Sequence, residues 1–427
     1  MFFIYKYLTL ILYPILILYI FLRKLKKKEH LERYKEKIFS NCFSENRKKF
    51  SKLIWFHAAS VGEMKSIIPI INELNKKYPN FEFLITTITL SSGNLFYDEM
   101  KNFKNIHHRY LPLDINFLIK KFISVWKPNM VFLVDSEIWP NLIFELKKNK
   151  IPLALINARI TKKSFKKWKL VKNFAKETFS KFDLCLSSSM ETTEYLKELE
   201  VKRIINNGNI KFINKIVTED ISNINKEFLE KNRFWFAAST HNKEEIECLK
   251  VHMKLKLKYD QLITIIAPRH INRAKNILKI CNKLNLSSQI LKKDEKISNN
   301  KEILIINSYG LLNEYFKYAK SVFIGKSLLS NLKDVGGQNP IDAAKLGCKI
   351  YHGPYINNFK EIYDILEKNK ISFKVDNADK LASNLNSDLE DPKKNFNKFT
   401  NILNDLERKI HHDTMKNINS FLTNEII

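Results

Sequence analysis

Glycine is scarce in this sequence, with nine residues among 427. A missing side chain permits a backbone with φ > 0 and allows a ligand or another chain segment to approach closely. In such a chain each glycine is therefore a candidate for one of these two roles. Six of the nine fall at predicted strand ends or loops, namely Gly62, Gly208, Gly325, Gly336, Gly337 and Gly353. We expect binding sites near these positions.

Cysteine is also scarce. The five cysteines are odd in number, are scattered and contain no CxxC pair: Cys42, Cys185, Cys248, Cys281 and Cys348. This pattern argues against a disulfide framework and against a zinc knuckle, and it is typical of a protein in a reducing compartment.

Acidic residues are outnumbered, since 45 Asp and Glu stand against 73 Lys and Arg, for a formal net charge of +28. Such a charge favours an anionic partner, whether a nucleic acid, an anionic membrane face or a phosphorylated substrate. Compositional drift toward Lys, Asn and Ile is an equally good explanation and needs no partner. A nucleic-acid-binding protein should show basic stripes interleaved with aromatic residues. The lysines here are dispersed, so we predict no nucleic-acid partner.

The first 22 residues carry one charge, Lys6, and are otherwise mostly Phe, Ile, Leu and Tyr. Their length is close to the ~20 residues that cross a bilayer core. The basic run Arg23–Lys28 follows directly, which predicts that the rest of the chain lies on the cytoplasmic side. A cleaved signal peptide is disfavoured because the small-residue cleavage site is missing and the basic run is on the wrong side. We predict a single membrane anchor with its basic flank in residues 1–28, and Pro14 would also allow a shallower, interfacial placement.

Strand-like and helix-like segments alternate in two blocks, residues 29–213 and 233–395. In the first block the predicted strands are the apolar run that begins at Leu53, then Phe81–Thr87, Ile106–Leu111, Met130–Val134, Leu153–Ile156 and Leu184–Ser187. In the second block they are Arg233–Ala238, Leu262–Ala267, Ser288–Leu291, Ile303–Ile306, Ser321–Ile324 and Cys348–Tyr351. This alternation predicts an α/β fold with two doubly wound, mostly parallel sheets. We expect two Rossmann-like domains that face each other across a cleft, a linker at residues 214–232 and a helix in residues 396–427.

Polar side chains follow several predicted strands of the first block. They are Ser60, Gly62 and Glu63 after the strand at Leu53, Asp135 and Glu137 after Met130–Val134, and Asn157 and Arg159 after Leu153–Ile156. Ligands of such folds collect at the carboxyl ends of the strands. Two acids there could act as a general base and as a carboxylate that positions an acceptor. Glu63 could also simply complement the dipole of the helix predicted at Met64–Lys77, and the same reasoning leads us to discount Asp135-x-Glu137 as a metal site.

The second block carries features that suit anions. They are Ser239-Thr240-His241 and Pro268-Arg269-His270 at strand ends, and Gly336-Gly337-Gln338-Asn339-Pro340-Ile341-Asp342 before a helix. Hydroxyls and free N–H groups at a helix start bind anions, and an arginine binds phosphate in a bidentate manner. Each feature could equally be a helix cap. Together the two blocks predict an acidic acceptor side and a cationic, nucleotide-type donor side, which is the layout of a two-domain glycosyltransferase.

A series of motifs, from the amino-terminal anchor to about Tyr363, resembles the bacterial 3-deoxy-D-manno-octulosonic acid (Kdo) transferases of lipopolysaccharide synthesis. In order, the motifs are His57-Ala-Ala-Ser-Val-Gly-Glu63, Glu137-Ile-Trp-Pro-Asn141, Asn157-Ala-Arg159, Gly208-Asn-Ile-Lys211, Ala238-Ser-Thr-His241, Pro268-Arg-His270, Gly336-Gly-Gln-Asn-Pro340 and Gly353-Pro354. The resemblance implies the GT-B architecture, a location at the bacterial inner membrane, and transfer of Kdo from CMP-Kdo to a lipid A precursor with inversion. It implies no metal and no other cofactor. A two-domain enzyme that uses a UDP-sugar is the alternative.

The resemblance also implies roles for single residues. Glu63 matches the catalytic base, and its place in a first helical turn should favour the ionised form. Glu137 matches an acid of the acceptor side, with Ser60, Gly62, Asp135 and Arg159 as further acceptor-binding residues. The donor-binding residues are Ser239, Thr240, His241, Arg269, Gly336, Gly337, Asn339 and Asp342. The chain has Asp135 and Asp342 where the family usually has Glu, and Lys326 where the family tends to have a second glycine. Lys326 could face the donor's anionic groups or project into solvent, and we favour solvent.

Overall fold

The structure is a computed structural model, and it describes residues 1–45, 47–48, 50–214, 216, 223–333, 335–391 and 396–426. The chain divides into two compact units. Unit 1 consists of Met1–Asn214 together with Glu407–Ile427, and unit 2 consists of Lys215–Leu406. The carboxyl-terminal residues therefore belong to the same unit as the amino terminus.

Unit 1 is built on a parallel sheet of seven strands in the order β3-β2-β1-β4-β5-β6-β7. The strands are β1 (Leu53–His57), β2 (Glu82–Thr87), β3 (Ile106–Tyr110), β4 (Met130–Val134), β5 (Leu153–Ala158), β6 (Leu184–Ser187) and β7 (Ile204–Asn206). The helices that follow β1 to β6 are α2 (Val61–Lys77), α3 (Leu90–Met100), α4 (Asn116–Trp126), α5 (Pro140–Lys148), α6 (Lys162–Leu170) with α7 (Lys172–Phe179), and α8 (Met190–Glu198). Every residue of β1, β2, β4, β5 and β6 is buried, as expected for parallel strands that are covered on both faces.

The strand order of unit 1 reverses between β1 and β4. From β1 the chain builds outward through β2 to β3, and it then returns to place β4 on the other side of β1. In open α/β sheets the ligand crevice forms at this reversal, outside the carboxyl ends of the two strands. The segments after His57 and after Val134 are therefore the expected ligand-binding segments of unit 1.

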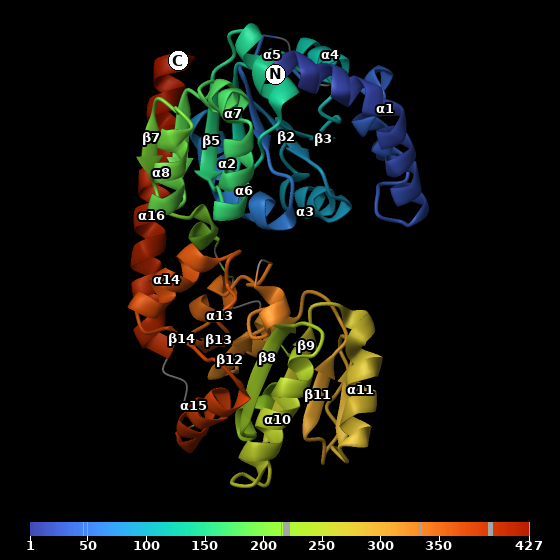
Figure 1. Cartoon of the computed structure of the whole chain (residues 1–427), viewed down its shortest axis with the longest axis vertical. Coiled ribbons are helices and arrows are strands. Elements are labelled where there is room, and N and C mark those ends of the chain that lie inside the picture. The colour runs from blue at the N-terminus through green and yellow to red at the C-terminus, as the bar shows by residue number, and fades with distance from the viewer. Residues whose placement is uncertain are drawn as a thin grey trace. The chain divides into compact units, whose positions relative to one another are not determined.

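Unit 2 repeats this architecture, with the strand order β10-β11-β9-β8-β12-β13-β14 (Figure 1). Its strands are β8 (Phe234–Thr240), β9 (Ile263–Pro268), β10 (Ser288–Leu291), β11 (Ile303–Ile306), β12 (Ser321–Ile324), β13 (Lys349–His352) and β14 (Ser372–Lys374). Its helices include α9 (Lys226–Lys231), α10 (Glu244–Lys256), α11 (Ala274–Lys283), α12 (Leu312–Phe316), α13 (Ile341–Lys345), α14 (Lys360–Lys368) and α15 (Ala378–Glu390). The order reverses between β8 and β12, so the ligand crevice is expected after these two strands.

Unit 1 also contains a long amino-terminal helix and, from Glu407 onward, the greater part of a long carboxyl-terminal helix. The amino-terminal helix α1 (Phe2–Leu25) lies beside α4, and the ring of Tyr13 packs edge-on against that of Phe117 at 5.2 Å (Figure 1). The carboxyl-terminal helix α16 (Phe396–Glu425) returns to the β7 side of the sheet, where Asn417 Nδ2 donates to Asn207 Oδ1 at 2.9 Å. Phe421 packs edge-on against Phe132 of β4, so α16 contributes to the core of unit 1.

The predicted pair of parallel α/β sheets is confirmed, and so is every predicted strand. The sequence reading missed β7 and β14, which have three residues each and lie at a sheet edge. Such strands bury too little apolar surface to stand out in a hydrophobic pattern. The sequence pattern also predicts one continuous helix over Ser164–Phe179, and this is wrong in one respect, because Val171 has a non-helical backbone and separates α6 from α7.

Candidate active site

Four of the residues with left-handed backbones lie at the carboxyl ends of central strands of the two sheets. Asp135 (φ 60°) and Asn157 (φ 52°) lie at the ends of β4 and β5, and Ser239 (φ 57°) and Lys326 (φ 58°) lie at the ends of β8 and β12. The strand register shifts near Asn157 and near Ser239. Bulges and strained backbones concentrate at functional sites, where they redirect side chains. The strain therefore marks the same two sheet edges as the strand order does.

Glu63 stands in the first turn of α2, and its carboxylate is held by the segment that precedes the helix. Oε1 accepts a hydrogen bond from Ser60 Oγ at 2.7 Å, and Oε2 accepts one from the Ala59 N–H at 2.8 Å. Ser60 is also the N-cap of α2 and accepts from the Glu63 N–H at 3.4 Å. This reciprocal arrangement is a variant of the capping box. It fixes the rotamer of Glu63 and leaves each carboxylate oxygen with capacity for one more donor.

The pKa of Glu63 is raised from 4.5 to about 7. Burial is the main cause, followed by the negative charges of Glu137 and Asp135, and these effects outweigh the hydrogen bonds from Ser60 and Ala59. The expectation that the first-turn position would favour the ionised form is therefore wrong. A helix N-terminus contributes only part of a charge, whereas burial and two neighbouring carboxylates all favour the protonated form.

The expected role of Gly62 as a turn residue is also wrong. Gly62 is the second residue of α2, and it is not among the glycines with positive φ. A Cβ atom at this position would meet nothing within 4 Å. Gly62 therefore has no conformational reason to be glycine, but it keeps the exposed surface next to Glu63 free of side-chain atoms.

Glu137 ends a chain of hydrogen bonds that starts in the core. Trp55 Nε1–H donates to Thr86 Oγ1 at 2.8 Å, Thr86 Oγ1 lies 2.9 Å from His57 Nδ1, and His57 Nε2 lies 3.2 Å from Glu137 Oε2. His57 Nδ1 also lies 3.1 Å from the Thr86 carbonyl oxygen, so Thr86 contacts this nitrogen through both its backbone and its side chain. Trp139 Nε1–H also donates to Glu137 Oε2, at 2.8 Å. Glu137 is thus oriented by two donors, and its Oε1 has none from these groups.

Sequence reasoning gave His57 no role of its own. It is fully buried on β1, and its only signal was its place at the start of a recognised motif.

Asp135 is the third acid of this edge, and it is paired. Lys211 Nζ donates to Asp135 Oδ2 at 2.6 Å, and both side chains are mostly buried. Lys211 is carried by a loop that Asn157 holds, because Asn157 Oδ1 accepts from the Ile210 N–H at 3.0 Å. The Arg159 N–H donates to the Asp135 carbonyl oxygen at 3.2 Å. The structure thus brings the predicted residues Asp135 and Arg159 together and adds Lys211, which the sequence showed only as part of a motif.

In unit 2, the crevice between β8 and β12 contains a buried carboxylate that the sequence did not reveal. Glu244 accepts four backbone N–H bonds, from His241 at 2.8 Å, Lys326 at 2.6 Å, Ser327 at 2.8 Å and Leu328 at 3.0 Å. The side chain is fully buried, and burial raises its pKa in spite of these bonds. The expectation that the His241 N–H would be free for an external anion is therefore wrong. The protein's own carboxylate occupies that anion-binding position and ties the β12 loop to the start of α10.

Cationic side chains surround this crevice. The rings of His241 and His270 lie 5.6 Å apart, and the pKa of His241 is lowered to about 4 by burial and by the charges of Lys326, His270 and Arg269. Arg269 is exposed at the end of β9, and its charge contributes to lowering the pKa of the half-buried Lys326. Lys326 therefore belongs electrostatically to this cationic group, and the expectation that it projects into solvent stays a prediction. Gly325 permits this placement, since a Cβ there would lie 2.6 Å from Thr240 Cα.

The other predicted donor-side residues lie either at the end of β8 or in and just after the turn that precedes α13. Ser239 is partly exposed, but Thr240 is fully buried and its hydroxyl has no partner among the described residues, so it does not reach the surface. The Gly336–Asn339 turn comes close to the same crevice, because the Gly337 N–H donates to the Lys326 carbonyl oxygen at 2.6 Å and Gln338 Nε2 lies 3.4 Å from His241 Nε2. Asn339 Oδ1 accepts from the Ile341 N–H, and Asp342 lies half-buried in the first turn of α13.

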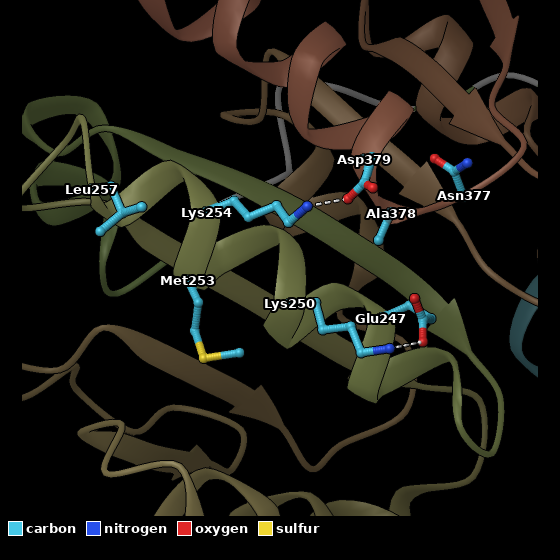
Figure 2. A pocket seen from close by; sticks show the side chains of 8 residues that line it. All are labelled: Glu247, Lys250, Met253, Lys254, Leu257, Asn377, Ala378 and Asp379. Atoms are coloured by element: carbon cyan, nitrogen blue, oxygen red, sulfur yellow. Dashed lines mark hydrogen bonds and ion pairs between the residues drawn. The ribbon is translucent and has the colours of Figure 1, made fainter.

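A surface hollow lies elsewhere on unit 2, between α10 and α15 (Figure 2). Its charged side chains are engaged with each other, since Lys254 pairs with Asp379 and Lys250 pairs with Glu247 at 2.8 Å. It lies on a helical layer and is not at the carboxyl edge of the sheet. We therefore do not assign it to the active site. Within the described part of the chain, no group of three or more His, Cys, Asp or Glu residues is placed to hold a metal ion.

Two Rossmann-like units with opposite electrostatic character define the class of protein. Carboxylates gather at the strand reversal of unit 1, and cationic side chains gather at that of unit 2. Two such units, one acidic and one cationic at the strand reversal, are typical of a glycosyltransferase of the GT-B architecture. The fold agrees with that of the UDP-GlcNAc 2-epimerase from Neisseria meningitidis, which is 15% identical with a TM-score of 0.58 over 88% of this chain and 100% of that chain.

Comparison with known sequences gives the family. Residues 27–214 match the family model described as 3-deoxy-D-manno-octulosonic-acid transferase (kdotransferase). The chain is 30% identical over 384 residues to the 3-deoxy-D-manno-octulosonic acid transferase of Rickettsia bellii, with 89% of each chain covered. It is 28% identical over 375 residues to that of Haemophilus influenzae, covering 85% of this chain and 84% of the relative. The chain belongs to the Kdo transferase family, the glycosyltransferases that add Kdo in lipopolysaccharide synthesis.

Proposed function

We propose that this protein transfers Kdo from CMP-Kdo to a hydroxyl group of the lipid A precursor lipid IVA, with inversion at the anomeric carbon, and that Glu63 is the general base. The observation that carries the role of Glu63 is the placement of its carboxylate at the strand reversal of unit 1, held by Ser60 and Ala59, where burial and the charges of Glu137 and Asp135 raise its pKa to about 7. A base with a pKa near the operating pH combines a substantial deprotonated fraction with enough basicity to accept a proton. An ordinary surface Glu, with a pKa near 4.3, would be a much weaker base.

In the proposed reaction the acceptor hydroxyl oxygen attacks the anomeric carbon of Kdo on the face opposite the CMP phosphate. The bond between carbon and the acceptor oxygen forms while the bond between carbon and the phosphate oxygen breaks. Glu63 takes the hydroxyl proton, and CMP leaves with the bonding electrons. Glu137 is held by His57 and Trp139, and Oε1 of its carboxylate is oriented to accept from another acceptor hydroxyl. Ser60, Gly62, Asp135 and Arg159 complete the proposed acceptor side.

The donor is assigned to unit 2 because its cations suit a nucleotide that carries negative charge. Arg269 is the main phosphate-binding residue in this proposal, since an exposed guanidinium can bind phosphate in a bidentate manner. Ser239, His241 and the Gly336–Asn339 turn lie around the same crevice, and Asp342 is proposed to accept ribose hydroxyls. Fixed positive charges that stabilise the departing CMP make a metal ion unnecessary for this step.

The test is to incubate the purified full chain with CMP-Kdo and lipid IVA and to analyse the product by mass spectrometry. We expect lipid IVA that has gained Kdo, formation of CMP, and competitive inhibition by CMP but not by UDP. Inhibition by UDP with no turnover of CMP-Kdo would instead support a UDP-sugar enzyme. RNA binding at submicromolar affinity that CMP does not affect would indicate a nucleic-acid-binding protein.

We also propose that α1 attaches the protein to the cytoplasmic face of the inner membrane. The helix is long and apolar enough to cross a bilayer, and the basic residues that follow suit an anionic leaflet. One side of α1 contacts unit 1: Tyr5 Oη donates to Asp114 at 2.9 Å, and Asn141 Nδ2 donates to Thr9 Oγ1 at 3.1 Å. The other side is exposed, with Ile11 73% accessible. These contacts support a helix that lies in the membrane surface, because a spanning helix could not keep polar bonds to the catalytic domain.

The membrane proposal is tested with Ile11→Glu in vesicles of phosphatidylethanolamine and phosphatidylglycerol. We expect binding to fall by at least tenfold without a change in melting temperature, because Ile11 is exposed. Leu257→Glu, at an even more exposed apolar residue of unit 2, is the matched control and should bind as the wild type does. Wild-type binding by Ile11→Glu would contradict the proposed attachment.

A further inference from the structure

Lys326 is held in an unusual position on the donor side. It follows β12 with a left-handed backbone, φ 58°, where the family pattern has a second glycine. Its N–H donates to Glu244 Oε2 at 2.6 Å, and its carbonyl oxygen accepts from the Gly337 N–H at 2.6 Å. A left-handed backbone is strained for lysine and unstrained for glycine. The chain therefore carries a long cationic side chain at a position where the backbone alone would favour glycine.

Glu244 fixes this conformation but leaves the lysine ammonium without a hydrogen-bonding acid. A carboxylate has about four lone-pair sites, and Glu244 already accepts four backbone N–H groups. Within the described residues, no carboxylate oxygen lies within ion-pair distance of Lys326 Nζ or of the Arg269 guanidinium. The charge of Glu244 acts favourably on Lys326, but the four backbone N–H groups occupy the Glu244 oxygens, so the ammonium is available to an anionic ligand.

The neighbours of Lys326 show which charge that ligand carries. β9, β8 and β12 are adjacent parallel strands, and their carboxyl ends place Arg269, His241 and Lys326 around one crevice. These side chains repel one another, which is seen in the lowered pKa values of His241 and Lys326. Cations that repel one another in this way are stabilised by an anion that binds among them.

We propose that Lys326 binds the phosphate group of the cytidine nucleotide together with Arg269, and that Glu244 is the positioning residue that holds Lys326 in place. This proposal rests on the proposed function, from which it takes the nucleotide. It adds a phosphate-binding residue at a position where the family pattern provides only backbone.

The experiment measures the affinity of the full chain for CMP by calorimetry, with cytidine as the probe that lacks phosphate. Lys326→Met is expected to weaken CMP binding about tenfold and to leave cytidine binding unchanged, since one charge-assisted hydrogen bond is worth about a factor of ten or more. Lys326→Arg should stay within about threefold of the wild type. Lys243→Met is the matched control, because Lys243 also has a left-handed backbone, φ 74°, but is exposed at the start of α10. It should bind CMP as the wild type does.

Two further variants separate binding from folding. Lys326→Gly should weaken CMP binding as much as Lys326→Met does but without a fall in melting temperature, because glycine relieves the strain. Glu244→Gln should also weaken CMP binding, and the double variant with Lys326→Met should be no weaker than the single ones. Wild-type affinity in Lys326→Met, or equal losses for CMP and cytidine, would overturn the proposal. If the wild type itself does not bind CMP, the proposed donor is wrong and this site is wrong with it.

Discussion

Replacing Glu137 with glutamine is expected to shift the acidic limb of the pH–rate profile by about one unit toward lower pH. In the wild type, kcat/KM should rise with pH through about 7 as Glu63 loses its proton. Part of that high pKa comes from the negative charge of Glu137, which is the largest cause after burial. A like-charge interaction in a partly screened site is on the order of 1–2 kcal/mol, and one pKa unit corresponds to about 1.4 kcal/mol. Removing this charge should therefore bring the limb to about pH 6.

Glutamine is a suitable replacement because it keeps the local hydrogen bonds. A side-chain oxygen at the Oε2 position can still accept from His57 and from Trp139. The assay is the initial rate of CMP release from CMP-Kdo between pH 5 and 9 at limiting lipid acceptor. The position of the limb is the decisive quantity, since loss of an acceptor contact would lower the whole profile without moving it. Glu99→Gln, which removes an exposed charge from α3 of the same unit, is the control and should not shift the limb. A Glu137→Gln limb at the wild-type pH would refute the assignment of Glu63 as the titrating base.

Three further predictions concern the same cluster. Glu63→Gln should lower kcat by about 10²- to 10⁴-fold. The same variant should stabilise the folded protein by up to about 3 kcal/mol above pH 7 and by nothing below pH 4.5. The reason is that the raised pKa of Glu63 makes its ionised form unfavourable in the folded state. Thermal unfolding at pH 8 and at pH 4 checks this. Thr86→Val should destabilise by about 1–3 kcal/mol in urea unfolding and lower kcat, because it leaves the Trp55 indole N–H unpaired and removes the hydroxyl contact of His57 Nδ1. Lys211→Met should destabilise by about 3–5 kcal/mol in urea unfolding at pH 7 by leaving the carboxylate of Asp135 buried without its partner.

The acids of unit 1 could be found from the sequence because strand ends are local signals. An apolar run followed by Ser, Gly and Glu, or by Asp and Glu, places those residues at one edge of a parallel sheet without further information. The supporting residues could not be found in this way. His57 reads as part of a strand, and Lys211 is one of many lysines, so their partners Glu137 and Asp135 become evident only when distant segments meet.

Glu244 shows the same limit on the donor side. In the sequence it is one acid among several at the start of a helix, where acids are common for electrostatic reasons. Three of its four donors come from residues 326–328, more than eighty positions away. For that reason the N–H group of His241 appeared available to a ligand when it was not.

The sequence by itself determined the two α/β sheets, the strand ends that carry polar groups, and the family. These follow from the spacing of apolar residues within short segments and from ordered motifs, which are properties of neighbouring residues. Only the tertiary structure decided the chemical state of those groups. The pKa of Glu63 depends on its burial and on charges that lie more than seventy residues away in the chain, and both exist only once β1 and β4 are side by side. The first-turn position alone pointed to an ionised acid, and the fold raises the pKa of that acid to about 7.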